Sequence, residues 1–543
     1  MSSPPGLLSN PDPGKSRGTE PSLQRKITWT GAFWVSSGVP ALVLFSIGAV
    51  VAAVGKPAWL VWTVSILFGF LQAFTYAEIA GLFPGKSGGA AIYGAVAWVR
   101  YSKVLAPVSV WCNWFAWSPV LAIGSGLTAG YVLLALFPAD SPVHTWKVVL
   151  LDLGMLKDGL TIRLNATFLV GTAVMLLVFA VQHGGILRSA KATMLLGIVA
   201  LVPLLVIGMV PILTGDLPSA SFLPLVPLTR DSTNNVIDGA WDRAGWTLFM
   251  GGLFIAAWST YAFETSVCYT RELKNPRADT FKAIFYSGLL CLAAFTLIPL
   301  AFQARLGLDG MLAKDIADGS GVGNAMSQFL GGGTLVRHGL LLLLSLALLL
   351  ATMTAMAGSS RTLYQASVDG WLPRYLSRVN QHGAPMAAMW TDLGFNLSLL
   401  ALSDYVFVLA ASNVGYIIFC FLNLNAGWIH RLDRPSRERP WKAPTWLLST
   451  GTVLAFVNAF ILGMGANVWG SGTLLTGLVF ISLIVPVFLY RHYVQDKGKF
   501  PVTTVEDMHL GTEEGITKRA GIWPYLAIVA GIAVVCLGIL LAA

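Results

Sequence analysis

Glu264 is the residue of this sequence whose type and setting most clearly indicate chemistry, because it is a carboxylate inside an apolar stretch. Trp258, Ser259 and Tyr261 precede it there and add two aromatic rings and two hydroxyls. An ionisable side chain within a membrane segment costs several kcal/mol and is a functional candidate by default. Burial disfavours the charged form of a carboxyl, so Glu264 is the candidate for proton coupling. The alternative is that Glu264 only ties its helix to a neighbouring one.

A second cluster, Ser36, Ser37, Gly38 and Val39, lies directly before Pro40 in the first apolar stretch. Glycine permits non-helical torsions, and proline removes a donor and biases the preceding residue away from the helix. Backbone groups freed inside a membrane are tolerated only where protein or a water-filled cavity surrounds them. The cluster is therefore expected to bind substrate through its backbone, and the alternative is a simple proline kink.

The composition places both clusters in a membrane protein. Of the 543 residues, 55% are hydrophobic and 11% are charged, whereas charged residues make up about 25% of a soluble domain. Apolar stretches long enough to cross a hydrocarbon core recur about thirteen times. The predicted spans are residues 30–54, 58–82, 104–137, 166–181, 192–213, 246–270, 284–302, 339–368, 387–402, 405–429, 446–465, 474–490 and 523–541.

Basic residues alternate between successive connections, which predicts the orientation, since cations resist translocation. They follow the second, fourth, sixth, eighth and tenth spans, for example at Lys86, Arg188, Lys274, Arg378 and Arg439. That side is expected to be cytoplasmic, with the N-terminus inside and the C-terminus outside. The net charge of +9 is thereby explained without a nucleic-acid partner.

Three groups of motifs lie at the ends of the second, sixth and eighth spans and in the connections that follow. They are Tyr76-Ala77-Glu78 with Pro84 and Gly88-Gly89; Glu272 with Lys274-Asn275-Pro276-Arg277; and Ser360-Arg361, Leu363-Tyr364, Asp369-Gly370, Leu372-Pro373, Val379-Asn380, Gly383 and Pro385. In this order and on this side of the membrane, they resemble the signatures of the amino acid–polyamine–organocation superfamily. The resemblance covers about residues 27–490.

The resemblance implies an all-α polytopic membrane protein with a LeuT-like 5+5 inverted repeat, accessory C-terminal helices and alternating access. A repeat of that kind places the substrate near the midplane, between spans one and six. The expected division is a disordered cytoplasmic tail (1–26), a ten-helix core (27–430), accessory helices eleven and twelve (431–490), a cytoplasmic loop (491–521) and one further helix (522–543).

The resemblance also suggests roles for single residues. Trp258, Ser259 and Glu264 match positions that gate or contact substrate in the arginine/agmatine type of antiporter, and Ser37-Gly38-Val39 matches its unwound first span. Ser36 replaces the first glycine of that segment. Ala355 and Leu121 replace a tryptophan and an asparagine of that antiporter type, so arginine specificity is not implied.

The coupling ion stays open between a proton and sodium. Thr352 and Thr354 in the eighth span are sodium candidates through their oxygens, although threonine in a membrane helix usually bonds its own backbone. No cofactor or metal is expected, because the five cysteines form no CxxC pair. Gly85-Lys86-Ser87 is not read as a phosphate loop, because Ala80 replaces the glycine that the motif requires.

The sequence therefore predicts a permease in the cell inner (plasma) membrane that moves an amino acid or related organic amine, and not an enzyme. An exchanger of amino acids or polyamines is the first alternative. A non-transporting ligand sensor on the same fold and a channel are weaker alternatives. The identity of the substrate and the direction of transport stay open.

Overall fold

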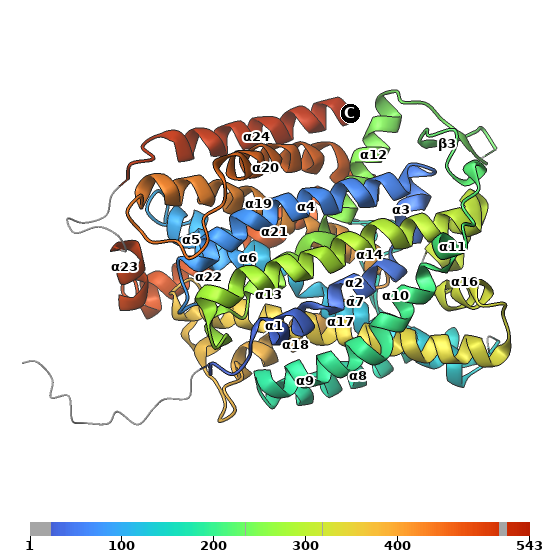
Figure 1. Cartoon of the computed structure of the whole chain (residues 1–543), viewed down its shortest axis with the longest axis horizontal. Coiled ribbons are helices and arrows are strands. Elements are labelled where there is room, and N and C mark those ends of the chain that lie inside the picture. The colour runs from blue at the N-terminus through green and yellow to red at the C-terminus, as the bar shows by residue number, and fades with distance from the viewer. Residues whose placement is uncertain (1–22, 139, 234, 318, 510–517) are drawn as a thin grey trace, which may run out of the picture.

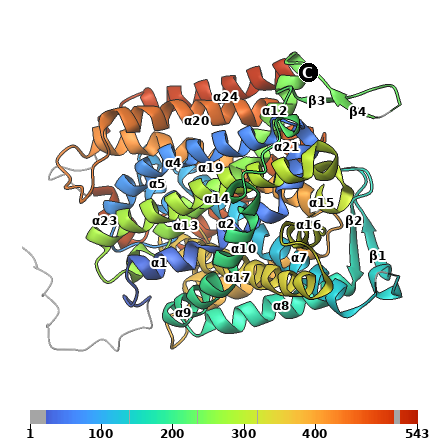
Figure 2. The same ribbon diagram turned by 45° about the vertical axis from the view of Figure 1, so that its right-hand side comes forward.

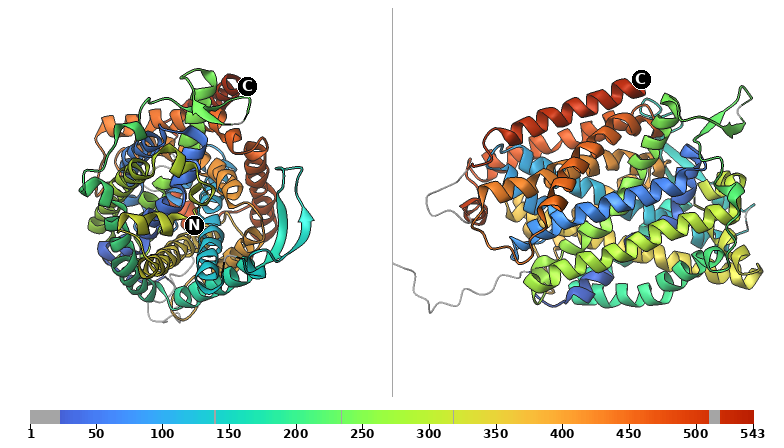
Figure 3. Two further views of the ribbon diagram at one scale, coloured as in Figure 1. Left: turned by 90° about the vertical axis from the view of Figure 1, so that its right-hand side faces the viewer. Right: turned by 45° about the horizontal axis from the view of Figure 1, so that its top comes forward.

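Long apolar runs become long helices here, because a helix satisfies its internal backbone groups within its own segment. The computed structural model describes residues 23–138, 140–233, 235–317, 319–509 and 518–543. The long helices run side by side along the longest axis of the molecule (Figure 1). Viewed along that axis, they form one bundle (Figure 3).

The helices of the first half are α1 (Trp29–Ser36), α2 (Gly38–Ala41), α3 (Ile47–Val54), α4 (Ala58–Gly81), α5 (Ala90–Trp98), α6 (Leu105–Trp117), α7 (Pro119–Leu136), α8 (Ala166–His183), α9 (Ile186–Leu196), α10 (Val202–Gly208) and α11 (Val210–Leu213). The helices of the second half are α12 (Arg243–Ala256), α13 (Tyr261–Val267), α14 (Pro276–Leu312), α15 (Lys314–Ala317), α16 (Val322–Phe329), α17 (Thr334–Val368), α18 (Met386–Leu400), α19 (Tyr405–Asp433), α20 (Thr445–Gly465), α21 (Thr473–Ser482), α22 (Ile484–Leu489), α23 (Val502–His509) and α24 (Trp523–Ala542). The strands form two antiparallel hairpins, β1 (Lys147–Asp152) with β2 (Thr161–Asn165), and β3 (Leu228–Arg230) with β4 (Val236–Asp238).

The two ends of the bundle differ in character. One end, called the basic end below, holds the loops around Lys86, Arg271, Arg374 and Arg437. The other, the hairpin end, carries both hairpins and the C-terminus (Figure 2). Three helices that start at the hairpin end are N-capped by the side chains of Asn165, Asp242 and Asp404, each of which accepts a backbone N–H bond. Such caps satisfy donors that the helix itself leaves unpaired.

The chain enters the bundle at the basic end. Residues 1–22 of the predicted tail lie outside the described residues. The last residues of that predicted tail pack against the bundle, since Leu23 is buried and the Lys26 N–H donates to the Glu272 carbonyl at 3.0 Å. The folded part therefore includes residues 23–26.

The structure supports most, but not all, of the roughly thirteen predicted membrane spans. Within the described ranges, 11 helices are long and apolar enough to cross a membrane, and the bent pair Trp29–Phe45 and Ile47–Val54 makes a twelfth. The remaining predicted span is α18, which has 15 residues and is about 22 Å long at 1.5 Å per residue. That is less than a hydrocarbon core of about 30 Å. The count of thirteen and the inverted repeat both stay predictions.

Large apolar side chains cover the outside of the bundle. Leu475 in α21 is 65% exposed and Leu540 in α24 is 72% exposed, whereas the carboxylates of Glu264 and Asp392 are fully buried. Soluble proteins show the opposite distribution of charge. Lipid satisfies an apolar exterior and leaves polar groups to find partners inside. The structure is therefore that of an all-α polytopic membrane protein.

Candidate functional site

The first span is interrupted at Ser37, between α1 and α2. Thr354 of α17 closes this interruption. Its hydroxyl donates to the Val35 carbonyl at 2.7 Å and accepts the Gly38 N–H at 3.2 Å. The backbone groups that a substrate would use are thus paired with a side chain from another helix.

Gly38 lies against the backbone of α17. A Cβ at this position would be 2.4 Å from Thr354 Oγ1 and 2.7 Å from the Ala351 Cα. Contacts below 3.0 Å require a neighbour to move, and a neighbouring Cα cannot move cheaply. The glycine is therefore required by close helix packing, in addition to any role in a break.

The larger bend of the first span is not within Ser36–Pro40, where the sequence predicted the unwinding. The axes of Trp29–Phe45 and Ile47–Val54 differ by 44°, and Ser46 separates them. Pro40 is the third residue of the short helix α2, so its missing N–H removes no bond of a helix interior. A 3₁₀ turn at Leu42–Phe45 then leads into the bend.

The hydroxyls of the first cluster bond their own helix. Ser36 Oγ donates to the Ala32 carbonyl at 2.7 Å and lies 3.2 Å from Ser287 Oγ of α14. Ser37 Oγ donates to the Trp34 carbonyl at 2.7 Å. Neither hydroxyl is free in this conformation, so the backbone remains the part of this cluster that is suited to bind a substrate.

The sixth span is also interrupted, although it contains no proline. Helix α12 ends at Ala256, a 3₁₀ turn covers Ala257–Thr260, and α13 follows. The change of helix type leaves carbonyls without their usual donors. Asn413 of α19 supplies a replacement donor. Its Nδ2 donates to the Phe254 carbonyl at 3.2 Å and to the Ile255 carbonyl at 3.0 Å.

Three polar atoms of this interruption are buried without a hydrogen-bond partner among the described residues. They are Trp258 Nε1, Ser259 Oγ and Glu264 Oε2. The other carboxylate oxygen, Glu264 Oε1, accepts a bond from the Tyr416 hydroxyl at 3.1 Å. Unpaired buried polar atoms are rare in native proteins and indicate a functional role or a missing partner. The side chain of Tyr261, also a predicted site residue, lies outside the described part of the chain.

Trp258 packs as a core residue in this conformation. Its ring centre lies 6.0 Å from that of Trp62 and 5.4 Å from that of Phe295, both edge-on. A cavity of about 20 Å³ beside it is lined by residues of both interrupted spans, including Ser46 and Ile255. That volume holds about one water molecule. The cavity is therefore too small for an amino acid in this conformation.

The two sodium candidates are not brought together. Thr352 Oγ1 donates to the Leu348 carbonyl of its own helix at 2.8 Å and faces Gly124 of α7. Thr354 instead faces the first span. Their oxygens therefore cannot share one ion in this conformation.

Sequence reasoning missed a second buried carboxylate, Asp392 of α18. Its Oδ1 accepts bonds from Trp114 Nε1 at 2.9 Å and from Ser118 Oγ at 2.6 Å, and its Oδ2 accepts one from the Ser359 hydroxyl. The sequence signal that could have found Asp392 is the same as for Glu264, namely a charged residue inside a predicted span. Three donors from α6, α17 and the junction of α6 with α7 make Asp392 a tie between helices.

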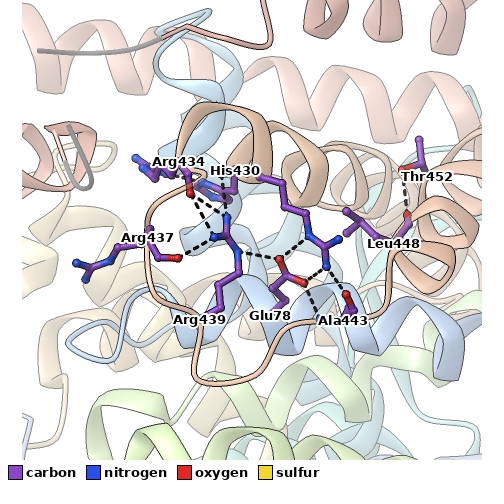
Figure 4. A network of polar contacts seen from close by, with 9 residues as sticks. Glu78, His430, Arg434, Arg437, Arg439, Ala443, Leu448 and Thr452 are labelled. Atoms are coloured by element: carbon purple, nitrogen blue, oxygen red, sulfur yellow. Dashed lines mark hydrogen bonds and ion pairs between the residues drawn. The ribbon is translucent and has the colours of Figure 1, made fainter. Parts of the chain in front are cut away.

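The signature motifs gather at the basic end. Glu78 accepts bonds from Arg431 Nη2 at 2.6 Å, from Arg439 Nε at 3.0 Å and from the Ala443 N–H at 2.8 Å (Figure 4). Burial lowers the pKa of Arg439, and the charge of Glu78 opposes that effect. Charge-assisted bonds of this kind are among the strong ones. They hold the basic loop 434–444 against the end of α4.

A second motif pair joins α17 to the end of the sixth span. Arg361 Nη2 donates to Glu272 Oε1 at 2.9 Å, and both side chains are buried. The two residues belong to different motifs that are far apart in the sequence. Their contact ties the two motifs together at this end of the bundle.

Comparison with known proteins adds to this geometry. A family model described as amino acid permease matches residues 27–490. The chain is 23% identical to the polyamine transporter PUT1 of Oryza sativa subsp. japonica, over 84% of this chain and 79% of that protein. It is 22% identical to the polyamine transporter RMV1 of Arabidopsis thaliana, over 72% of this chain and 73% of that protein.

A bacterial relative has a different named substrate. The chain is 22% identical to the branched-chain amino acid permease BcaP of Lactococcus lactis subsp. cremoris, over 56% of this chain and 61% of that protein. The family model covers most of the chain and confirms the resemblance that the motifs indicate. The chain therefore belongs to the amino acid permease family.

Proposed function

We propose that this permease is a secondary active transporter that moves an amino acid or a related organic amine by alternating access. The observation that carries the proposal is the set of unpaired buried atoms Trp258 Nε1, Ser259 Oγ and Glu264 Oε2 at the interruption of the sixth span. Transporters of this kind place their substrate where two interrupted spans meet. The protein would lie in the inner (plasma) membrane with its basic end in the cytoplasm.

An amino acid substrate would bind through both of its charged groups. Its carboxylate would take the N–H groups of Ser37–Val39, because the start of a half-helix favours an anion. The Gly38 N–H would exchange its bond to Thr354 for one to the substrate. The amino group would meet carbonyls near Trp258 to Tyr261, with Trp258 excluding water.

An organic amine would use the site differently. Two relatives are named polyamine transporters, and a polyamine has no carboxylate for the N–H groups of the first span. Its ammonium groups would instead pair with Glu264, whose Oε2 is free among the described residues. Glu264 would then serve as the counter-charge or exchange a proton. An exchanger that moves one amine for another uses the same contacts.

Uptake into proteoliposomes tests the proposal. The purified protein is reconstituted and offered labelled amino acids and polyamines under an imposed proton gradient, a sodium gradient or no gradient. Accumulation above equilibrium supports active transport, and uptake that needs preloaded substrate supports exchange. Binding without flux supports a sensor, and flux that does not saturate supports a channel. No binding and no uptake of any member of the panel would overturn the proposal.

A further inference from the structure

The chain folds back across the basic end after the span Thr473–Gln495. Residues 496–509, called the return segment, contain α23. Thr504 Oγ1 donates to the Asp369 carbonyl at 2.8 Å. Lys86 Nζ lies between two carboxylates, 2.6 Å from Asp369 Oδ1 and 2.7 Å from Asp507 Oδ2. The return segment therefore contacts the loops that follow α4 and α17.

The two ends of the return segment are also anchored. Asp496 accepts bonds from Arg374 Nη2 and Arg491 Nε, each at 2.6 Å. Near its C-terminal end, Arg434 Nη2 donates to the Asp507 carbonyl at 2.7 Å. Between them, Pro501 lies directly over Gly370.

Only glycine fits beneath Pro501. Gly370 has a φ of +86°, and a Cβ there would lie 2.6 Å from Pro501 Cδ. The glycine belongs to the motif Asp369-Gly370 that follows α17. A side chain at this position would be strained and would also push the return segment away.

The loop that Lys86 belongs to covers the end of the sixth span. The Gly88 N–H donates to the Cys268 carbonyl at 3.0 Å, and a Cβ on Gly89 would lie 3.0 Å from Cys268 Sγ. Cys268 follows α13, the second half of the interrupted span, and is fully buried. Movement of this loop would therefore uncover the site from the basic end.

We propose that the return segment is a latch that keeps the basic end closed, and that Lys86 must release Asp507 before the protein opens on that side. The inference rests on the proposed alternating access, and it adds the element that controls one of the two openings. Burial raises the pKa of Asp507, although Lys86 and Arg434 act in the opposite direction. Desolvation of the ionised Asp507 carboxylate thus opposes part of its attraction to Lys86. A contact that is only partly favoured in this way can open in each transport cycle.

Cys268 is a native reporter for this opening. Full-length protein carrying Cys536→Ser, which removes the exposed cysteine of α24, is placed in lipid nanodiscs and treated with a hydrophilic maleimide. Peptide mapping by mass spectrometry gives the labelling rate of Cys268. Asp507→Asn should raise this rate about tenfold, as expected when one charge-assisted bond is lost.

Glu506→Gln is the matched control. Glu506 is the neighbouring carboxylate on α23, it is exposed, and it makes no ion pair within the part of the chain that the structure describes. The labelling rate of Cys268 in this variant should stay within about twofold of the rate in the parent, as is usual for a surface substitution. A rate raised equally by Glu506→Gln would overturn the latch, because a general loss of acidic charge would then explain the result.

Thr504→Val is a second test that leaves every charge in place and removes only the bond to the Asp369 carbonyl. It should also speed labelling, while the thermal melting temperature of the protein stays unchanged. Labelling at the parental rate in both Asp507→Asn and Thr504→Val would overturn the latch. Labelling needs no substrate. A failure of uptake in proteoliposomes would therefore count against the proposed function, and the labelling rates would still test the latch.

Discussion

Glu264 and Asp392 are both fully buried carboxylates, but their surroundings differ. Asp392 accepts bonds from three side chains on neighbouring helices. Glu264 accepts one, from Tyr416, and its second oxygen has no partner among the described residues. A carboxylate saturated by donors is held in place, whereas one with a free oxygen can take a proton or a cation. Glu264 is therefore the stronger candidate for coupling.

Glu264→Gln should flatten the pH dependence of uptake. Glutamine keeps the size of the side chain and can still bond Tyr416, but it cannot exchange a proton. We expect uptake by the variant in proteoliposomes to be nearly constant across a pH series, with a free energy of unfolding within about 1 kcal/mol of the parent.

Tyr416→Phe is the control for this variant, since it removes the partner hydroxyl and keeps the carboxyl. It should retain a pH-dependent rate. If Glu264→Gln shows the parental pH profile, Glu264 is a tie between helices and coupling must be sought elsewhere.

The sequence indicated Trp258, Ser259 and Glu264 as a polar cluster because polar side chains are rare inside apolar stretches. It did not indicate the residues of α19 that bond this span. Asn413 donates to the Ile255 carbonyl and Tyr416 donates to Glu264, and both lie more than 150 positions after the group that they bond. Only the packing of α19 against the sixth span brings them there. Asn413 is itself a polar residue inside a predicted span, so the same rule would have found it.

At the scale of elements, the sequence indicated an interruption of the first span but not the place where the span bends most. Gly38 and Pro40 correctly indicated a break in the first span, but the 44° bend is at Ser46. The hydroxyl of Thr354 pairs the Val35 carbonyl and the Gly38 N–H on either side of Ser37. Such a compensation comes from another helix and is not visible in the local sequence.

Gly38→Leu should abolish high-affinity binding of an amino acid. The added Cβ alone would approach Thr354 Oγ1 to 2.4 Å, and overpacking of this kind costs about 1 to 3 kcal/mol. We expect affinity to fall about tenfold or more, measured by binding in detergent. Gly130→Leu in α7 is the control, because no atom lies within 4 Å of a Cβ there.

Trp258→Leu tests the other interruption in the same assay. The indole is packed between Trp62 and Phe295, so its loss leaves space at the turn and should weaken binding while the protein still inserts. If both Gly38→Leu and Trp258→Leu bind the transported amino acid as tightly as the parent, the substrate site lies elsewhere. If only Gly38→Leu binds normally, the N–H groups of the first span do not hold the substrate carboxylate.

At the scale of the whole molecule, the extra helix α24 is an integral part of the bundle. It packs on α20 through two glycines, since a Cβ on Gly463 would lie 2.2 Å from the Val535 carbonyl oxygen and one on Gly538 would lie 2.8 Å from the Phe460 carbonyl oxygen. Small residues let membrane helices approach this closely. At its end, Arg243 Nε donates to the Leu541 carbonyl at 2.6 Å, which ties α24 to α12 at the hairpin end.

Topology reporters should therefore place the loop at Lys442 and the C-terminus on opposite sides of the membrane. Lys442 precedes Ala443, whose N–H bonds Glu78 at the basic end, whereas Ala543 follows the contact of Leu541 at the hairpin end. We expect the positive charge of the basic end to keep that end in the cytoplasm. Fusions of green fluorescent protein and alkaline phosphatase after Lys442 should fluoresce and lack phosphatase activity, and fusions after Ala543 should do the reverse. Cytoplasmic readings at both positions would mean that α24 lies along the membrane surface, and the helices up to residue 495 would keep their orientation.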